Sequence, residues 1–308
     1  MHGDKETIEQ LSTIQDFMDW GARKLGSADL FYGHGTDNAL DEATYLILHT
    51  LNLSHDLAPE DLQADLPEND KQAILQVLEQ RIIEQKPAAY LTNEAWFSGL
   101  SFYVDERVLI PRSPIAELIE ERFSPWVKEG RVNRILDLCT GSGCIAIASA
   151  YAFPEAVVDA VDLSDDALQV ARINIERHEM NDRVFPVKSD LFSNLSGQTY
   201  NIIVSNPPYV SKQEMEQLPR EYMHEPAFGL ESGKEGLDAT ITILRQSAAF
   251  LEPNGILVVE VGNSEDALVE RFPEIPFMWL EFERGGHGVF LLTAEQLNEY
   301  GGMLASGN

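Results

Sequence analysis

Apolar residues recur every three or four positions through the first part of the chain, a spacing that places them on one face of a helix. The first predicted helix has an apolar stripe made of Ile8, Leu11, Ile14, Met18 and Leu25. Asp37 is expected to cap a second helix, and a third is expected from Asn69 to Gln85, ending before Pro87. Residues 1–90 are therefore predicted to form a small helical domain that recognises a substrate.

The next segment, residues 91–114, changes character and is predicted to be a linker. Aromatic and β-branched residues flank Ser98-Gly99, which indicates a β-hairpin between Ala95 and Val104. Pro111 and Pro114 follow, and because proline restricts the backbone we expect a rigid connector here.

Residues 115–308 show a third pattern, in which short apolar strands alternate with helices. Strands are predicted at 135–138, 157–161, 184–188, 200–205 and 256–261, with helices at 145–152, 165–178 and 237–251. Ser164 and Ser264 are each expected to cap a helix, and segments 279–283 and 289–293 to close the sheet as an antiparallel hairpin. The alternation predicts an α/β domain with a mostly parallel, doubly wound, Rossmann-like sheet.

Polar residues stand where several of these strands end. Asp137, Asp162, Asp190 and Asn206 each lie at or just beyond the carboxyl end of a predicted strand. Ligands of doubly wound sheets bind at that edge. We therefore expect these four residues to border one site.

The charge narrows the choice of partner. The chain has 22 basic and 51 acidic residues, a formal net charge of −29. Nucleic acid is bound through lysine and arginine that displace counterions, so direct nucleic-acid binding is disfavoured. A basic protein partner suits such a charge, although acidity that serves solubility or a salty habitat explains it equally well.

Other compositional features point to a cytoplasmic protein. The first residues, Met1–Glu6, are polar, and the longest nearly apolar stretch, Cys144–Phe153, is too short to span a bilayer. Cys139 and Cys144 have no neighbouring ligand pair that completes a zinc pattern, so they are expected to be buried, reduced thiols and no metal site is predicted.

A glycine-rich turn follows the first strand of the α/β domain and marks a candidate cofactor site. Its residues are Asp137, Leu138, Cys139, Thr140, Gly141, Ser142 and Gly143. The two glycines allow a sharp turn and close approach of a ligand. The carboxylate of Asp162, which is followed by Leu163, can accept hydrogen bonds from both hydroxyls of a ribose. Asp190 can accept from an adenine amino group while Leu191 covers the base.

A nicotinamide dinucleotide would use a similar turn, but its G-x-G-x-x-G spacing is not met. Cys139 stands where the first glycine would be and Ala146 where the last would be. S-adenosylmethionine (AdoMet) has no phosphate and therefore needs no pyrophosphate cradle.

The run Asn206-Pro207-Pro208-Tyr209 follows an apolar strand directly and is the most specific signal in the chain. The prolines remove two donors and leave carbonyl acceptors, and Asn206 adds a side-chain acceptor. Together they can hold both hydrogens of an NH2 group, while Tyr209 offers a ring on which a planar amide or base can stack. Asn206, Pro207 and Tyr209 are thus the catalytic candidates, and Pro208 completes the substrate-binding run. Asn206 is also expected to border the cofactor.

These motifs together resemble the class I AdoMet-dependent methyltransferases and, more narrowly, the protein-(glutamine-N5) methyltransferase family, the HemK/PrmC/PrmB group. The resemblance covers nearly the whole chain and includes Ile110–Arg112 and the later run Glu225–Leu237. It implies a mostly parallel seven-stranded sheet with an N-terminal helical bundle and a linking hairpin. It also implies AdoMet against Cys139–Gly143, Asp162 and Asp190–Leu191, and glutamine against Asn206–Tyr209.

Within the family, Phe102–Pro114 is similar to the branch that methylates a glutamine of large-subunit ribosomal protein L-three. The release-factor branch typically reads Pro-Arg-Pro-Asp, whereas this chain reads Pro111-Arg112-Ser113-Pro114. Cys139 replaces the first glycine of the class fingerprint, and its side chain is expected to crowd the cofactor. A release-factor methyltransferase, an adenine-N6 or guanine-N2 nucleic-acid methyltransferase and a catalytically silent AdoMet-binding protein are the alternatives.

Overall fold

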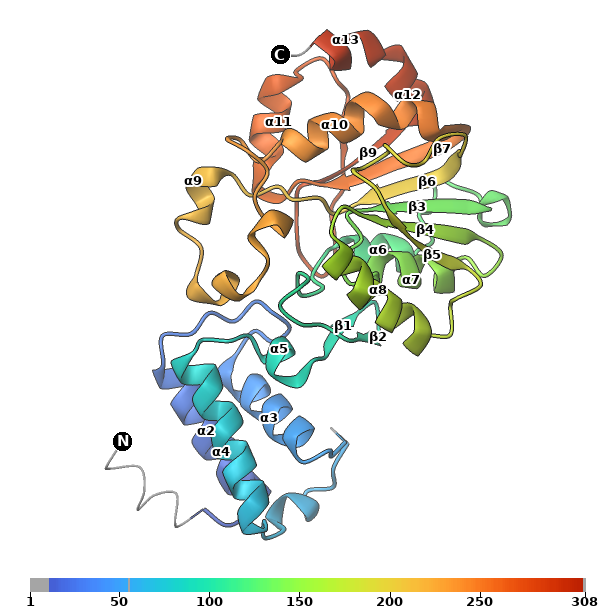
Figure 1. Ribbon diagram of the computed structural model, residues 1–308. Coiled ribbons are helices and arrows are strands. Elements are labelled where there is room, and N and C mark those ends of the chain that lie inside the picture. The colour runs from blue at the N-terminus through green and yellow to red at the C-terminus, as the bar shows by residue number, and fades with distance from the viewer. Residues whose placement is uncertain (1–10, 55, 307–308) are drawn as a thin grey trace. The chain divides into compact units, whose positions relative to one another are not determined.

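The computed structural model describes residues 11–54 and 56–306, so Met1–Glu6 and Ile8 lie outside the described residues. The chain divides into two compact units (Figure 1). The first contains the residues up to Glu94 together with Pro219–His224, and the second contains Ala95–Leu218 and the residues from Glu225 onward. The segment 219–224 thus belongs to the helical unit although the sequence on both sides of it belongs to the other.

The first unit is helical, as its apolar periodicity predicts. Its elements are α2 (Ile14–Ser27), α3 (Ala39–Thr50), η1 (Asp61–Gln63), α4 (Glu68–Ile83) and α5 (Ala88–Thr92). The cap predicted for the second helix is wrong, because α3 begins one residue later than expected. Asn38 is the cap and accepts from the Asp41 amide, while Asp37 accepts from the Asn38 side chain at 2.7 Å.

A buried ion-pair network joins the segment 219–224 to the rest of this unit. The Arg81 guanidinium, 1% exposed, lies 2.7 Å from the Glu42 carboxylate and 3.1 Å from that of Glu221. It also donates to the Phe31 carbonyl at 2.9 Å. Within the same unit His224 lies 2.9 Å from the Glu84 carbonyl. Segment 219–224 is therefore anchored in the helical unit.

The second unit is built on a twisted sheet whose strands, over the described residues, follow the order β5-β4-β3-β6-β7-β9-β8 (Figure 1). The strands are β3 (Arg134–Leu138), β4 (Val157–Asp162), β5 (Val184–Lys188), β6 (Tyr200–Ser205), β7 (Leu251–Glu260), β8 (Met278–Trp279) and β9 (Val289–Thr293). The first five in that spatial order run parallel, whereas β9 runs antiparallel to both of its neighbours, β7 and β8. This is the sheet of the class I methyltransferases.

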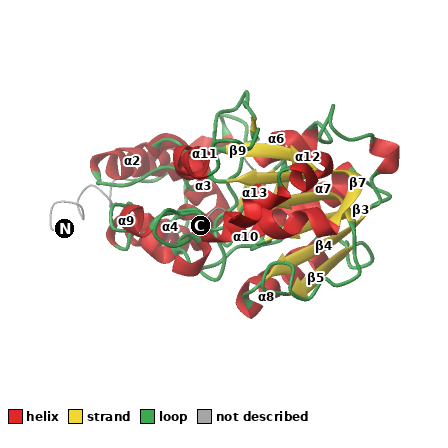
Figure 2. Cartoon of the chain, turned by 90° about the horizontal axis from the view of Figure 1, so that it is seen from above, coloured by secondary structure: helices red, strands yellow, loops and turns green. Residues whose placement is uncertain are grey.

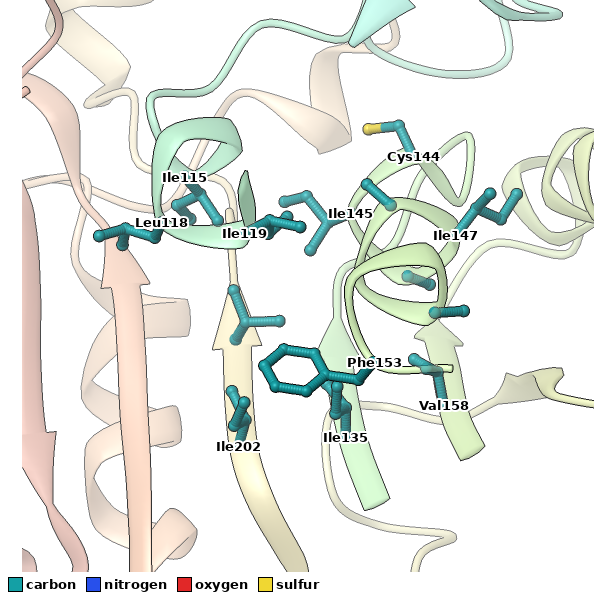
Figure 3. Packing of buried hydrophobic residues seen from close by; sticks show 14 of the residues in the cluster. Ile115, Leu118, Ile119, Ile135, Cys144, Ile145, Ile147, Phe153, Val158 and Ile202 are labelled. Atoms are coloured by element: carbon teal, nitrogen blue, oxygen red, sulfur yellow. The ribbon is translucent and has the colours of Figure 1, made fainter. Parts of the chain in front are cut away.

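Helices cover both faces of the sheet (Figure 2), because successive strand residues point to opposite sides. Ile135 of β3 packs in one apolar cluster, shown in Figure 3, and its neighbour Leu136 packs in the other. The first cluster includes residues of α6 (Ile115–Glu120), α7 (Cys144–Ala152) and α8 (Asp165–Arg177). The second includes residues of α10 (Asp238–Gln246), α11 (Glu265–Arg271), α12 (Ala294–Glu299) and α13 (Gly301–Ser306).

The predicted hairpin is present as β1 (Ala95–Phe97) and β2 (Leu100–Phe102), and the closing antiparallel strands are present as β8 and β9. The helix expected to reach residue 251 is shorter. After α10, η5 (Ser247–Phe250) follows, and Leu251 already pairs with Tyr200 in the sheet. Pro253 disfavours helix at the residue before it, which accounts for the early end.

Several short elements have no apolar periodicity long enough to predict them. They are η2 (Glu129–Arg131), α9 (Lys212–Met215), η3 (Arg220–His224), η4 (Ala227–Gly229) and η6 (Gly262–Ser264). None of the described helices is both long and apolar enough to cross a membrane.

Candidate active site

The strand register brings the predicted site residues to one edge of the sheet. Leu138 pairs with Val161 on one side and with Ser205 on the other, and Ser205 pairs with Val259. The residues that follow on these four strands are Cys139, Asp162, Asn206 and Glu260. They therefore lie next to one another at the carboxyl edge, and the turn at Asp190 follows the neighbouring strand β5.

Asp137 is fully buried beneath this edge. One carboxylate oxygen, Oδ2, accepts from the Thr140 hydroxyl at 2.5 Å and from the Ala146 amide at 3.1 Å. The other, Oδ1, has no hydrogen-bond partner among the described residues. Burial, with a smaller contribution from Asp162, raises the pKa of Asp137 to about 7. Since buried polar atoms are normally satisfied, the free oxygen fits a cationic or hydrogen-bonding ligand group.

The glycine-rich turn has an unusual backbone. Cys139, Gly141 and Gly143 all adopt left-handed conformations, with φ of +59°, +54° and +81°. A Cβ on Gly141 would meet nothing within 4 Å, so a ligand has room there, whereas one on Gly143 would touch Ala171 of α8 at 3.4 Å. The left-handed conformation of Cys139 costs about 1–2 kcal/mol, and such strain is concentrated at functional sites.

The thiols differ from the prediction in one respect. Both cysteines are free, but only Cys144 is buried, while Cys139 is partly exposed at the turn. Burial and the nearby Asp162 and Asp137 raise the pKa of Cys139, which keeps it a neutral thiol.

Asp162 ties the end of β4 to this turn. Its two oxygens accept from the main-chain amides of Ser164 and Gly141, each at 2.9 Å. Burial raises its pKa, and these two hydrogen bonds oppose the rise. Each carboxylate oxygen has a second lone pair, so the group can still accept from hydroxyls of a ligand. Ser164 also caps α8 through its side chain, as predicted.

Apolar side chains flank Asp162 and Asp190. Leu163 is 61% exposed, and Leu191 is partly buried with a left-handed backbone, φ +45°. Asp190 itself is exposed. This arrangement of an acid beside an apolar surface fits a nucleoside.

The Asn206-Pro-Pro-Tyr run begins where β6 ends. The Asn206 side chain is partly buried and makes no hydrogen bond within the described residues, and the Asn206 and Pro207 carbonyls accept none there either. The hydroxyl of the preceding residue, Ser205, donates to the Leu138 carbonyl at 2.8 Å. This bond joins the start of the run to the end of β3, where the glycine-rich turn begins. The acceptors predicted to hold an NH2 group are thus available.

Tyr209 is held from three directions. Its hydroxyl donates to Glu260 Oε1 at 2.9 Å, and its carbonyl accepts from the Ser264 hydroxyl at 2.8 Å. Its ring lies on the backbone of Gly262, where a Cβ would be 2.6 Å from Cε2. Ser264 was predicted to cap α11, but its side chain makes no capping bond because it is engaged with Tyr209 and Glu235.

Glu260 was missed by the sequence interpretation. It ends β7, is 4% exposed, and accepts from the hydroxyls of Tyr209 and Ser113. Burial raises its pKa to about 7 despite those hydrogen bonds and the nearby Arg112. The signal was present, since Glu260 ends an apolar strand just as Asp162 does.

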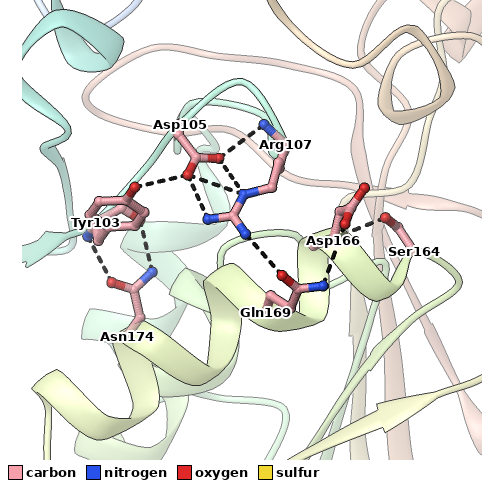
Figure 4. Close-up of polar contacts among 8 residues, drawn as sticks. Tyr103, Asp105, Arg107, Ser164, Asp166, Gln169 and Asn174 are labelled. Atoms are coloured by element: carbon pink, nitrogen blue, oxygen red, sulfur yellow. Dashed lines mark hydrogen bonds and ion pairs between the residues drawn. The ribbon is translucent and has the colours of Figure 1, made fainter.

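Asn174 was missed as well. It is fully buried on α8, accepts from the Tyr103 amide at 2.7 Å, and donates to the carbonyls of Tyr103 and Ser142 at 2.9 and 2.8 Å. Figure 4 shows the two hydrogen bonds between Asn174 and Tyr103 together with the Asp105–Arg107 ion pair and the Arg107–Gln169 hydrogen bond. Asn174 therefore fixes the glycine-rich turn against the segment that follows the hairpin.

The described residues contain no group of three or more His, Cys, Asp or Glu that could hold a metal ion. Residues 123–235 match the family model of the methyltransferase small domain. Among solved structures, a methyltransferase from Pyrococcus furiosus is similar over 64% of this chain and 89% of its own, with a TM-score of 0.46 and 19% identity.

Two curated proteins, from serogroup B and serogroup A strains of Neisseria meningitidis, are both named ribosomal protein uL3 glutamine methyltransferase. Each is 51% identical over 293 residues, which is 95% of this chain and 96% of the relative. Similarity of this extent includes the helical unit, the glycine-rich turn and the Asn206–Tyr209 run. The chain therefore belongs to the family of ribosomal protein uL3 glutamine methyltransferases.

Proposed function

We propose that the protein transfers a methyl group from AdoMet to the side-chain amide nitrogen of a glutamine in ribosomal protein uL3, also called L-three. The observation that supports this most strongly is the uncommitted Asn206 side chain beside two carbonyls that accept no hydrogen bond, at the edge that also has the glycine-rich turn. The names of the 51% identical relatives support the same acceptor.

The cofactor half of the site fits AdoMet. The turn from Cys139 to Gly143 would approach the ligand, Asp162 would accept from the ribose hydroxyls, and Leu163 and Leu191 would cover the base with Asp190 near its amino group. The free Oδ1 of Asp137 suits a positively charged group. When bound, AdoMet supplies an electrophilic methyl group on a sulfonium.

The acceptor half addresses the weak nucleophilicity of an amide. The lone pair of an amide nitrogen is delocalised, and hydrogen bonds from both of its hydrogens to Asn206 and the Pro207 carbonyl draw electron density onto nitrogen. Tyr209 would stack on the planar amide. In the transfer the new N–C bond would form as the S–C bond breaks, which would leave a neutral thioether, and one amide proton would pass to solvent water. Orientation in line with the methyl group can contribute up to about 7–11 kcal/mol.

The net charge of −29 suits a basic protein acceptor, and the helical unit would serve substrate recognition. Such a role fits a cytoplasmic enzyme. Segment 219–224, anchored by Arg81, connects that unit along the chain to the Asn206–Tyr209 run.

The proposal is tested by transfer of isotopically labelled methyl from AdoMet to three separate acceptors: uL3, a peptide-release factor, and a mixture of duplex DNA and RNA. We expect label on uL3 that disappears when its modified glutamine is replaced by glutamate. Label on the release factor alone would keep the amide chemistry and reject the acceptor. Label on nucleic acid alone would reject the proposal.

A further inference from the structure

Glu260 joins two segments of the second unit that are far apart in the sequence. Its Oε1 accepts from Tyr209, 51 residues away, and its Oε2 accepts from Ser113, 147 residues away, at 2.5 Å. The Ser113 hydroxyl in turn accepts from the Ile115 amide at 3.2 Å, at the start of α6. One carboxyl group thus connects the connector before α6 with the acceptor run after β6.

The strand register places this carboxyl beside the acceptor residues. Ser205 pairs with Val259, so Asn206 and Glu260 are the next residues on adjacent strands. The Arg112 guanidinium, which lies 2.7 Å from the buried carboxylate of Glu225, lowers the pKa of Glu260 through its charge, and the hydrogen bonds of Glu260 go to Tyr209 and Ser113. Glu260 is therefore committed to the two hydroxyls.

A purely structural role would not require an acid at this position. Burying a carboxyl group is costly unless its oxygens are hydrogen-bonded, and an apolar residue could end β7 with its neighbours Val258 and Val259. The Tyr209 carbonyl and ring are already fixed by Ser264 and Gly262, and Glu260 controls the remaining end of the side chain. The hydrogen bond to Glu260 fixes the direction in which the Tyr209 side chain points.

We propose that Glu260 is a positioning residue for the acceptor glutamine, acting through Tyr209 and setting the connector at Ser113 against the same run. This inference rests on the proposed function. Glu260 orients the ring on which the amide lies, so its loss misplaces the acceptor and leaves the cofactor turn intact. Misplacement of reacting groups by about 1 Å can lower the rate about 100-fold.

The test is a double-mutant cycle between Glu260→Gln and Tyr209→Phe, with kcat, KM for the protein acceptor and AdoMet affinity measured for each variant. Tyr209→Phe removes the phenol–carboxyl hydrogen bond, and Glu260→Gln weakens it, because the glutamine amide has no charge and one oxygen in place of the two that accept from hydroxyls. We therefore expect each change to lower kcat/KM about 10- to 100-fold. The kcat/KM of the double variant should be no more than about threefold below that of the less active single variant. AdoMet affinity should stay within threefold of wild type.

Glu252→Gln is the matched control, because Glu252 lies at the other end of β7 and accepts a hydrogen bond from Thr199. It should leave kcat/KM unchanged. Effects of the two site variants that multiply in the double variant would overturn the proposal, as would a loss of AdoMet affinity parallel to the loss of turnover.

If Glu260→Gln does not fold, Ser113→Ala is combined with Tyr209→Phe instead. Ser113→Ala removes the bond to the other carboxylate oxygen, Oε2, and so loosens Glu260; we expect it to lower kcat/KM in the presence of the phenol and to have little further effect once the phenol is absent. Effects that multiply would again contradict the proposal. Failure of the proposed function is seen separately, because it appears as absence of uL3 methylation by the wild-type protein. The cycle itself can be measured on whichever acceptor the wild type methylates.

Discussion

The two halves of the site are built by different means. On the cofactor half, main-chain geometry dominates: Cys139, Gly141 and Leu191 have left-handed backbones, and both oxygens of Asp162 accept from main-chain amides. On the acceptor half, side-chain bonds between distant segments dominate, as in the Tyr209–Glu260 hydrogen bond. The first half depends on local conformation and the second on tertiary packing.

This difference predicts how each half fails. A change on the cofactor half should act on AdoMet affinity, because it alters the surface that the cofactor contacts. A change on the acceptor half should act on turnover of the protein substrate and leave the cofactor bound. The following predictions are ordered from the largest expected effect to the smallest.

Asn206→Ala should have the largest effect. It removes the side-chain amide oxygen that would accept from the substrate NH2 group, and loss of one such preorganised group typically lowers the rate about 100- to 1000-fold. Methyl transfer to uL3 at saturating AdoMet measures it. Asn298→Ala, on α12 with a bond to the Ala294 carbonyl, is the control and should keep full activity. Activity of Asn206→Ala close to wild type would exclude Asn206 from the chemistry.

Asp162→Ala should lower AdoMet affinity about 10- to 100-fold, since it removes charge-assisted hydrogen bonds worth about 1.5–3 kcal/mol. Isothermal titration calorimetry measures the affinity. At saturating AdoMet, kcat should recover to within about fivefold of wild type, as expected for a residue that contributes uniform binding. A fall in kcat as large as that of Asn206→Ala would remove the distinction between the halves.

Asp137→Asn tests the buried carboxyl of the cofactor half through pH. The folded protein keeps the Asp137 proton up to about pH 7, whereas the unfolded chain releases it near the ordinary pKa of 3.8. Between these values the folded state binds more protons, so its free energy of unfolding falls as pH rises. Asparagine does not titrate.

The variant should therefore gain stability relative to wild type, without AdoMet, by an amount on the order of 4 kcal/mol as pH rises to 7, since the pKa differs between the two states by about three units. Urea unfolding at several pH values measures this. The difference should vanish at pH values below the ordinary pKa. A difference independent of pH would mean that Asp137 is ionised throughout.

Gly141→Ala should have the smallest effect. Alanine in the left-handed conformation lowers the free energy of unfolding by about 1 kcal/mol. Its Cβ also points where the ligand is expected, so the AdoMet affinity should fall about fivefold as a separate effect. Gly197→Ala is a closely matched control, because Gly197 also has a positive φ, +78°, and no neighbour within 4 Å of a Cβ. It should lose similar stability and keep its affinity. Equal affinities for the two variants would place the cofactor elsewhere.

The same contrast explains what the sequence could predict. The glycine-rich turn, Asp162 and the Asn206–Tyr209 run are contiguous motifs beside apolar strands, and the structure brings their ends to one edge. Glu260 and Ser113 were not recognised as partners, because a hydrogen bond between residues 147 apart leaves no trace in local spacing. The Ser264 cap was wrong for the same reason, since Tyr209 competes for its hydroxyl.

The helical unit shows a related limit. Apolar spacing predicted α4 closely, because the helix buries one face. It placed the start of α2 too early, because Leu11 lies before the helix and Thr13 is its cap. It did not predict that Pro219–His224 returns to this unit, since that depends on Arg81 being buried between Glu42 and Glu221. A buried ion pair between distant segments has no periodicity.

The most direct measurement of the division into two halves is the AdoMet dissociation constant of Asn206→Ala, determined by calorimetry beside wild type and Asp162→Ala. The account predicts a value within about threefold of wild type for Asn206→Ala, and the 10- to 100-fold weakening for Asp162→Ala. Weakening of Asn206→Ala by as much as Asp162→Ala would contradict the account, because the acceptor run would then be part of the cofactor site.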